Sequence, residues 1–145
     1  MNLNELGLTP ETFQMNLEVN RIASFADWPF DNEDCECTSK KLAEAGFYHI
    51  PTDKEPDLVR CYVCLKELEG WEPEDDPKKE HKKHAPKCPF VKLNKKEEDL
   101  KIEDLIKMEV ERQKAIIEKA YNMQIDKFRA EADKTRDNLE ELMLA

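Results

Sequence analysis

The chain has 145 residues, a formal net charge of −10 and a charged fraction of 39%. This length suits one compact domain with an added segment, and no apolar run is long enough for a transmembrane helix, so no membrane contact is expected. The first five residues lack the basic start and apolar stretch of a secretory signal. Together with five cysteines, that favours a reducing compartment, the cytosol or the nucleus. So acidic a chain suits a basic peptide rather than duplex nucleic acid, and no sequence-specific nucleic-acid binding is expected.

The composition changes sharply along the chain. All eight prolines and all three glycines lie at or before Pro89, whereas residues 90–145 contain no helix breaker. We therefore predict an N-terminal segment over 1–17 with a short helix starting at Thr9, and a compact domain over 18–91. A linker over 92–101 and a long amphipathic helix over 102–143 complete the predicted organisation.

The compact half contains signals for short elements. Thr38 is placed to cap a short helix that runs through Ala45 and closes at Gly46. Residues 47–50 and 59–63 read as strands, the second by its alternation of apolar and polar side chains. About seventy residues make only a marginal core, so this domain needs an additional source of stability.

Four residues have the spacing of a zinc site. The pattern is C-x2-C, sixteen residues, then H-x6-C, made by Cys61, Cys64, His81 and Cys88. Three thiolates and one imidazole form a natural tetrahedral set for zinc. Asp76 suits the N-cap of a helix that carries His81. Four protein ligands leave no open position for substrate, so we predict one structural Zn²⁺, against the alternative of four buried, unligated side chains.

The second half reads as one long helix, roughly 63 Å at 1.5 Å per residue. Its apolar residues recur in a heptad rhythm, and a second apolar row widens the sector beyond what a two-stranded coil needs. That width favours a bundle with helices of other chains. Folding back onto its own compact half remains the alternative, although a small domain cannot cover so long a helix. The residues predicted to meet partner helices are Ile106, Val110, Ile117, Tyr121, Phe128 and Leu139.

The zinc pattern has recognisable surroundings. They include Arg21-x3-Phe25-x2-Trp28-Pro29-Phe30, Ala45-Gly46-Phe47, Leu68-Glu69-Gly70-Trp71 and Asp75-Asp76-Pro77. Over about residues 18–91 the chain resembles the baculoviral inhibitor-of-apoptosis repeat, the BIR family. The resemblance implies an α+β fold: a small zinc-binding domain with short helices around a three-stranded antiparallel sheet, followed by one long C-terminal α-helix. The single repeat and the long helix resemble the single-repeat members.

For single-repeat members the resemblance implies a non-catalytic subunit of the chromosomal passenger complex. Its helix would bundle with borealin-like and inner-centromere-protein-like helices, and Aurora B kinase would be an indirect partner. The expected locations are the nucleus and centromere, later the spindle midzone and midbody, and the cytoplasm. No nucleophile–base pair or open metal position indicates an enzyme. The alternative from the wider family is an apoptosis inhibitor that acts on caspases or binds alanine-initiated pro-apoptotic peptides.

The resemblance also implies a groove that captures a free peptide N-terminus. The ligand of single-repeat members resembles a histone-three tail phosphorylated on its third-position threonine. Glu69 and Asp75 would meet the ammonium, although charge alone favours a solvated acidic turn at these positions. The remaining groove residues would be Leu68 and Trp71 around the first side chain, His84 and Lys66 at the phosphate, and Glu55 at a basic side chain.

The resemblance further implies a homodimer formed outside the complex by apolar residues that flank the zinc domain. Phe90, Ile102 and Leu105 are available for such an interface. Glu97, however, stands where a large aromatic side chain is expected, and it disfavours dimerisation.

Overall fold

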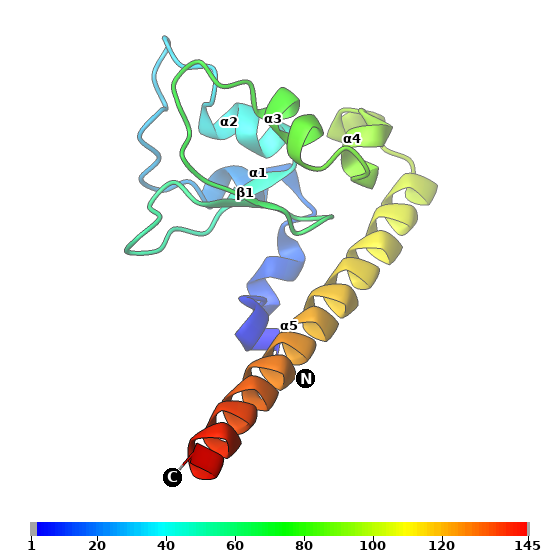
Figure 1. Cartoon of the computed structure of the whole chain (residues 1–145). Helices are drawn as coiled ribbons and strands as arrows, with labels where there is room; N and C mark the ends of the chain where they lie inside the picture. The colour runs from blue at the N-terminus through cyan, green and yellow to red at the C-terminus, as the bar shows by residue number, and fades with distance from the viewer. Residues whose placement is uncertain (1–2, 145) are drawn as a thin grey trace.

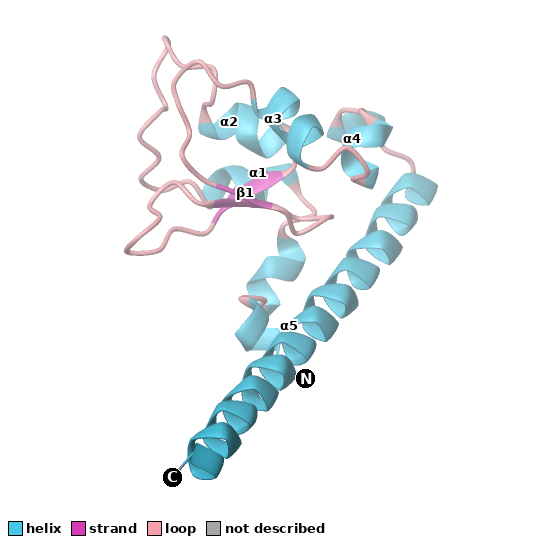
Figure 2. Ribbon diagram, in the orientation of Figure 1, coloured by secondary structure: helices cyan, strands magenta, loops and turns pink. Residues whose placement is uncertain are grey.

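A three-stranded antiparallel sheet lies at the centre of the N-terminal half (Figures 1 and 2). In the computed structural model, which describes residues 3–144, its strands are β1 (Phe47–His49), β2 (Val59–Cys61) and β3 (Glu67–Leu68), in that order. Phe47 of β1 pairs with Cys61 of β2, and Val59 of β2 pairs with Leu68 of β3. Every residue of β1 and β2 is buried, so this small sheet is covered on both faces. The α+β architecture implied by the resemblance is confirmed.

Short helices surround the sheet, and one long helix follows. The N-terminal segment forms two short 3-10 helices, and Thr9 is the N-cap residue of the second, where the sequence predicts a short helix to start. The helix α4 ends inside the predicted linker. The elements are η1 (Leu3–Leu6), η2 (Pro10–Gln14), α1 (Glu18–Ala23), α2 (Ser39–Glu44), α3 (Pro77–His84), α4 (Pro89–Leu93), η3 (Glu97–Asp99) and α5 (Ile102–Leu144).

The helix boundaries in the compact half follow from local capping. The Thr38 hydroxyl accepts from the Lys41 amide at 3.4 Å, and Asp76 accepts from two amides in the first turn of α3. Gly46 closes α2 with a φ of +92°, and a Cβ there would lie 2.9 Å from the Phe90 ring. All three capping residues are therefore where the sequence predicts them, and only glycine fits between α2 and Phe90.

A buried cation connects α1 to the rest of the core. Arg21 is 1% exposed; its Nε donates to the Ala43 carbonyl at 2.9 Å and its Nη1 to the Met15 carbonyl at 2.8 Å. The guanidinium lies 4.6 Å from the centre of the Tyr62 ring and 3.8 Å from Glu97. Hydrogen bonds, a ring face and a carboxylate together compensate for its removal from water.

The helix α5 packs on the compact half along one face only. Its first half lies beside the sheet and the N-terminal segment, and its second half projects away (Figure 1). The fold-back alternative is thus correct for part of the helix. No helix within residues 3–144 has the length and apolarity to cross a membrane. The buried residues of α5 are Met108, Arg112, Ile116 and Ala120, and the last two pack with Leu6, Leu8 and Leu65.

A polar network fastens α5 to the sheet. Arg60 on β2 donates from Nε and Nη2 to Glu67 Oε1 at 2.9 and 2.7 Å, and from Nη1 to the Gly7 carbonyl at 2.8 Å. Lys119 on α5 reaches the same Glu67 oxygen at 2.8 Å. The Glu67 carboxylate therefore links β2 and β3 to α5, and Arg60 also binds the N-terminal segment through the Gly7 carbonyl.

Replacing Glu67 by alanine is expected to destabilise the protein by about 1–3 kcal/mol, because buried Arg60 loses its carboxylate. Burial opposes ionisation of Glu67, but hydrogen bonds from Lys119 and Arg60 hold its pKa below the ordinary value. Its contribution is therefore present above the pKa of the unfolded chain and is lost as pH falls through the folded pKa. Urea unfolding at pH 7 measures the effect, and Glu118→Ala is the matched control, whose equal loss would contradict this account.

Candidate metal centre and peptide cleft

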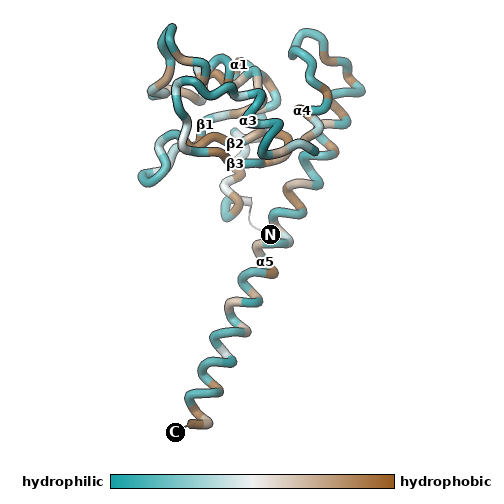
Figure 3. Tube along the Cα trace, turned by 45° about the horizontal axis from the view of Figure 1, so that its top comes forward, coloured by the Kyte–Doolittle hydropathy of each residue, from teal (hydrophilic) through white to brown (hydrophobic). Residues whose placement is uncertain are grey.

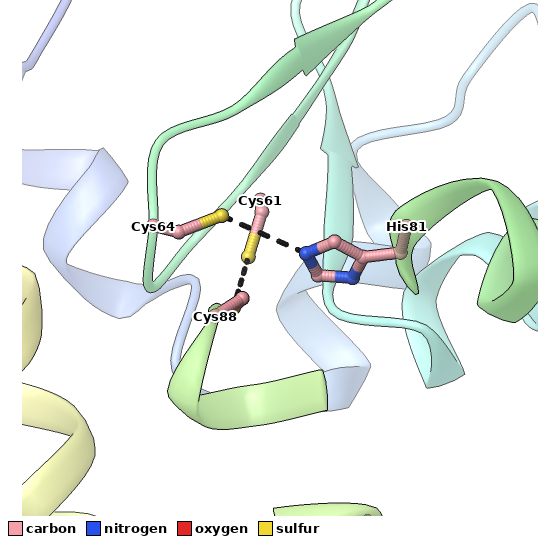
Figure 4. Close-up of side chains that lie close together, drawn as sticks. All are labelled: Cys61, Cys64, His81 and Cys88. Carbon is pink, nitrogen blue, oxygen red and sulfur yellow. Dashed lines mark hydrogen bonds between the residues drawn. The ribbon is translucent and has the colours of Figure 1, made fainter. Parts of the chain in front are cut away.

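The four predicted metal ligands converge from four places in the fold (Figure 4). Cys61 ends β2, Cys64 lies in the following turn, His81 is on α3, and Cys88 is the N-cap residue of α4. The two sulfurs of Cys61 and Cys88 lie 4.0 Å apart, and Cys64 Sγ lies 3.6 Å from His81 Nε2. All four ligand atoms lie within 4.8 Å of one another. A tetrahedral zinc would place sulfurs about 3.8 Å apart and sulfur about 3.6 Å from nitrogen.

Neighbouring groups orient these ligands. The Ala45 carbonyl accepts from His81 Nδ1 at 2.8 Å, which leaves the Nε2 lone pair facing the sulfurs. The Val63 amide donates to Cys61 Sγ at 3.4 Å. Leu65 adopts the left-handed conformation with a φ of 59°, a strained state for leucine that turns the chain after Cys64. The cluster is built to present four ligand atoms to one point.

Burial makes this cluster depend on a cation. Complete burial, together with the neighbouring sulfurs of Cys64 and Cys88, raises the pKa of the Cys61 thiol well above its ordinary value. Three thiolates in such a place are stable only beside a compensating positive charge. The four side chains therefore form a group able to hold one metal ion, and their donor types suit zinc.

A small cleft lies between the segment after β3 and the helix α3. Its volume is about 60 Å³, the smallest among the hollows described for this structure. This size suits a small group such as an ammonium with a methyl group. Five of the seven predicted peptide residues line it, and Gly70 and Glu80 complete the lining. The five are Leu68, Glu69, Trp71, Asp75 and His84.

The carboxylates on the acidic side of the cleft repel one another. Glu55 raises the pKa of exposed Glu69 by Coulombic repulsion, and Asp57 adds to the effect. Asp75 is held in place because its Oδ2 accepts from the Glu72 amide at 2.8 Å. A bound cation would relieve this repulsion, which favours an ammonium here.

Trp71 forms the inner wall of the cleft. Its ring packs edge-on to Phe47 with centroids 5.9 Å apart, and its amide donates to Asp57 Oδ2 at 2.8 Å. Its buried indole Nε1 has no hydrogen-bond partner among the residues that the structure describes. A buried donor without an acceptor costs about 1–3 kcal/mol.

The two residues predicted at the phosphate lie in different places. His84 is in the cleft, with its Nε2 3.2 Å from Glu80 Oε2. Lys66 lines a separate hollow of about 880 Å³ between the N-terminal segment and α5. The structure thus brings His84, but not Lys66, to the cleft lining. Glu80 was missed by the sequence reasoning, although its i,i+4 spacing from His84 was the available signal.

Comparison with known proteins identifies the family. Residues 21–92 match the family model described as "BIR: Inhibitor of Apoptosis domain". Baculoviral IAP repeat-containing protein 5.2-A of Xenopus laevis is 47% identical over 133 residues, which cover 92% of this chain and 84% of that protein. Baculoviral IAP repeat-containing protein 5 of Mus musculus is 46% identical, with 92% and 94% covered. This chain belongs to the BIR family. The resemblance to single-repeat members, the survivin group, is confirmed.

Beyond the BIR domain, the predicted partner stripe of α5 lies in solvent. Its six residues range from 48% exposed at Val110 to 73% at Phe128. Figure 3 shows hydrophobic positions recurring along α5 to its C-terminal end. The stripe lies on a different side of α5 from the face that packs on the compact half. The helix can therefore contact a partner through the stripe while it stays packed on the compact half.

The three residues predicted for a dimer interface differ in how far they are exposed. Phe90 is half-buried against Tyr62, with ring centroids 5.5 Å apart, whereas Ile102 and Leu105 are exposed. The Glu97 carboxylate accepts from the Glu18 amide at 2.5 Å, at the N-terminus of α1. That contact explains how an acidic residue is accommodated where an aromatic one is expected.

Proposed function

We propose that this protein is a non-catalytic scaffold of the chromosomal passenger complex. Its α5 would bundle with borealin-like and inner-centromere-protein-like helices, and Aurora B kinase would be positioned indirectly through them. The nucleus and centromere, and later the spindle midzone and midbody, are the corresponding locations. The observation that carries the proposal is the exposed apolar stripe of α5, which continues beyond the compact half of the chain.

The stripe requires a partner for physical reasons. Residues 106–139 span about 50 Å, and large apolar side chains stay in solvent along that length. Exposed apolar surface of this extent marks an interaction site in soluble proteins. The first half of α5 is already covered on one face by the N-terminal segment, so partner helices would complete a bundle on the other face.

We assign one structural Zn²⁺ to Cys61, Cys64, His81 and Cys88. When bound, it contributes folding free energy and no open coordination position. The ligands join the end of β2 to α3 and α4, and α3 also supplies Glu80 and His84 to the cleft. The metal site would thereby hold the two walls of the cleft at a fixed separation.

In the proposed complex the cleft reads an N-terminal histone-three tail. The ammonium would meet Glu69 and Asp75, and the alanine methyl would contact Leu68 and Trp71. His84 would face the phosphate on the third-position threonine. Lys66 would approach the phosphate from outside the cleft lining, and Glu55, whose charge repels that of Glu69, would attract a basic side chain further along the tail.

Phosphorylation of the third-position threonine is expected to tighten binding of a histone-three N-terminal peptide by about tenfold, because charge-assisted hydrogen bonds are stronger than neutral ones. Titration calorimetry on the full chain would compare this peptide with its unphosphorylated form and with an Ala-Val-Pro-Ile peptide.

Asp75→Asn and Glu69→Gln should weaken every peptide that carries a free N-terminus, and Asp53→Asn, outside the cleft lining, is the matched control. Equal affinity with and without the phosphate would remove the reader function. A clear preference for Ala-Val-Pro-Ile would favour the apoptosis-inhibitor alternative instead.

A further inference from the structure

A second hollow, of about 450 Å³, lies between α3 and α4, and its lining is strongly basic. One carboxylate, Glu44, is among the lining residues. This concentration of positive charge stands out in a chain with a net charge of −10. Five lysines line the hollow: Lys78, Lys79, Lys82, Lys92 and Lys95.

Three of these lysines lack an acidic partner. Within residues 3–144, no carboxylate oxygen lies within 4.0 Å of the ammonium of Lys78, Lys82 or Lys92. Lys95 pairs with Asp104 at 2.7 Å and Lys79 with Asp76 at 3.5 Å. These three ammonium groups line the same hollow, so together they are available to an external anion.

The position of two lysines on α3 is itself unfavourable. Lys78 and Lys79 lie in the first turn, at the positive end of the helix dipole, where a cation costs about 0.3–1 kcal/mol. Capping by Asp76 offsets part of this cost. Lys79 also pairs with Asp76, so the charge left without a partner in this turn is that of Lys78, which lines the hollow.

The hollow lies on the opposite side of α3 from the peptide cleft. Helix positions two residues apart differ by about 200° around the axis, so Lys78 and Lys82 point away from Glu80. Glu80 and His84 line the cleft, whereas Lys78 and Lys82 line the hollow. Ligands of opposite charge can therefore occupy the two sides of the helix at the same time.

The floor of the hollow is apolar. Pro86, Phe90 and Val91 contribute to it, and Phe90 and Val91 are only half-buried. The volume falls in the range of ligand sites, about 300–1,000 Å³, and is enough for one large apolar side chain with its neighbours. A phosphate backbone would gain nothing from this floor, and a duplex would be repelled by the rest of this acidic chain.

We propose that the hollow between α3 and α4 is a second docking site, which takes an acidic peptide segment of a partner protein. The segment would place one apolar side chain on Phe90 and Val91, with Asp or Glu residues on both sides facing the lysines. This site is distinct from the cleft for a basic, N-terminal peptide, and it does not depend on that function.

Fluorescence anisotropy would test the proposal with the full, zinc-loaded chain and the peptide Glu-Asp-Glu-Leu-Phe-Glu-Asp-Glu. The triple variant Lys78→Glu/Lys82→Glu/Lys92→Glu should weaken binding at least about tenfold. The matched control Lys87→Glu/Lys107→Glu/Lys134→Glu has the same net charge and lies outside the hollow, so it should bind within about twofold of wild type. Thermal unfolding and zinc content establish that both triples are folded.

Two further arms decide the chemistry of the ligand. Replacing Leu-Phe in the peptide by Ser-Ser should weaken binding, and Val91→Ala should remove most of that difference. Equal weakening by both lysine triples, or no preference for the apolar peptide, would overturn the proposal. Tighter binding of a duplex DNA of the same charge would also overturn it, because the occupant would then be DNA. Self-association of the wild-type chain that is lost in the Lys78→Glu/Lys82→Glu/Lys92→Glu variant would overturn it too, because the occupant would then be a second copy of this chain.

Discussion

Removal of the metal is expected to unfold residues 18–91. Structural zinc sites contribute apparent free energies of about 10–16 kcal/mol, whereas the net stability of a domain is about 5–15 kcal/mol. A domain of some seventy residues obtains only about 3–5 kcal/mol from its core. Once the ion is gone, the buried sulfurs and the strained turn at Leu65 have no compensation.

Zinc content, near-ultraviolet circular dichroism and thermal unfolding before and after chelation would measure this effect. The variant Cys61→Ser should behave like the chelated protein and lose its stoichiometric zinc. Cys35→Ser is the matched control, because Cys35 is also buried but lies outside the ligand cluster. A chain that stays folded with no metal bound would contradict the assignment.

The double variant Ile117→Glu/Tyr121→Glu is expected to abolish assembly with the partner helices. These side chains are 62% and 63% exposed in the free chain, and burial of each large apolar side chain is worth about 1.5–3 kcal/mol. Two losses together weaken assembly by about a thousandfold. The compact half should unfold at an unchanged temperature, since neither residue belongs to its core.

Co-purification of the full chain with borealin-like and inner-centromere-protein-like subunits gives the readout. The control Asn122→Glu/Asn138→Glu adds the same charge at exposed positions away from the stripe and should leave assembly intact. Recovery of the partners by the stripe variant would argue against the scaffold function. Equal loss in both variants would point to net charge rather than to the stripe.

Deletion of the whole of α5 would disturb the compact half as well as the partner stripe. Removal of all residues after 97 would also remove Met108, which the Tyr62 hydroxyl contacts at 3.4 Å, and Ile116, which covers Leu6 and Leu8. A truncation after residue 124 keeps these contacts and deletes the projecting half. It tests the part of the stripe that holds Phe128 and Leu139, without loss of the contacts that stabilise the compact half.

Local chemistry explains why parts of this structure were predictable. Zinc ligands depend on residue type and short spacing, and caps depend on a few neighbouring residues, so Cys61, His81 and Thr38 could be assigned from sequence. The face of α5 that docks could not, because Ile116 is covered by Leu6 and Leu8, more than one hundred residues earlier. In the sequence alone, Ile116 belongs to the second apolar row, which widens the sector predicted to face partner helices.

The cleft shows the same division between local and distant information. Leu68, Glu69 and Trp71 are close in sequence and arrive together, whereas Glu80 joins them only through the packing of α3. Lys66 lies close to Leu68 in sequence but lines the hollow beside α5. Such placement is decided by the turn after Cys64, whose left-handed Leu65 has no sequence signature.

The projecting half of α5 has a consequence for how much of this protein a cell holds. Under the proposed scaffold function, a free chain that displays Phe128, Leu139 and Leu142 to water would be an orphan subunit of the kind that quality-control proteases degrade. Its lifetime would then be set by the supply of companion subunits rather than by its own rate of synthesis. Depletion of one companion would lower the level of this protein while its messenger RNA stays constant.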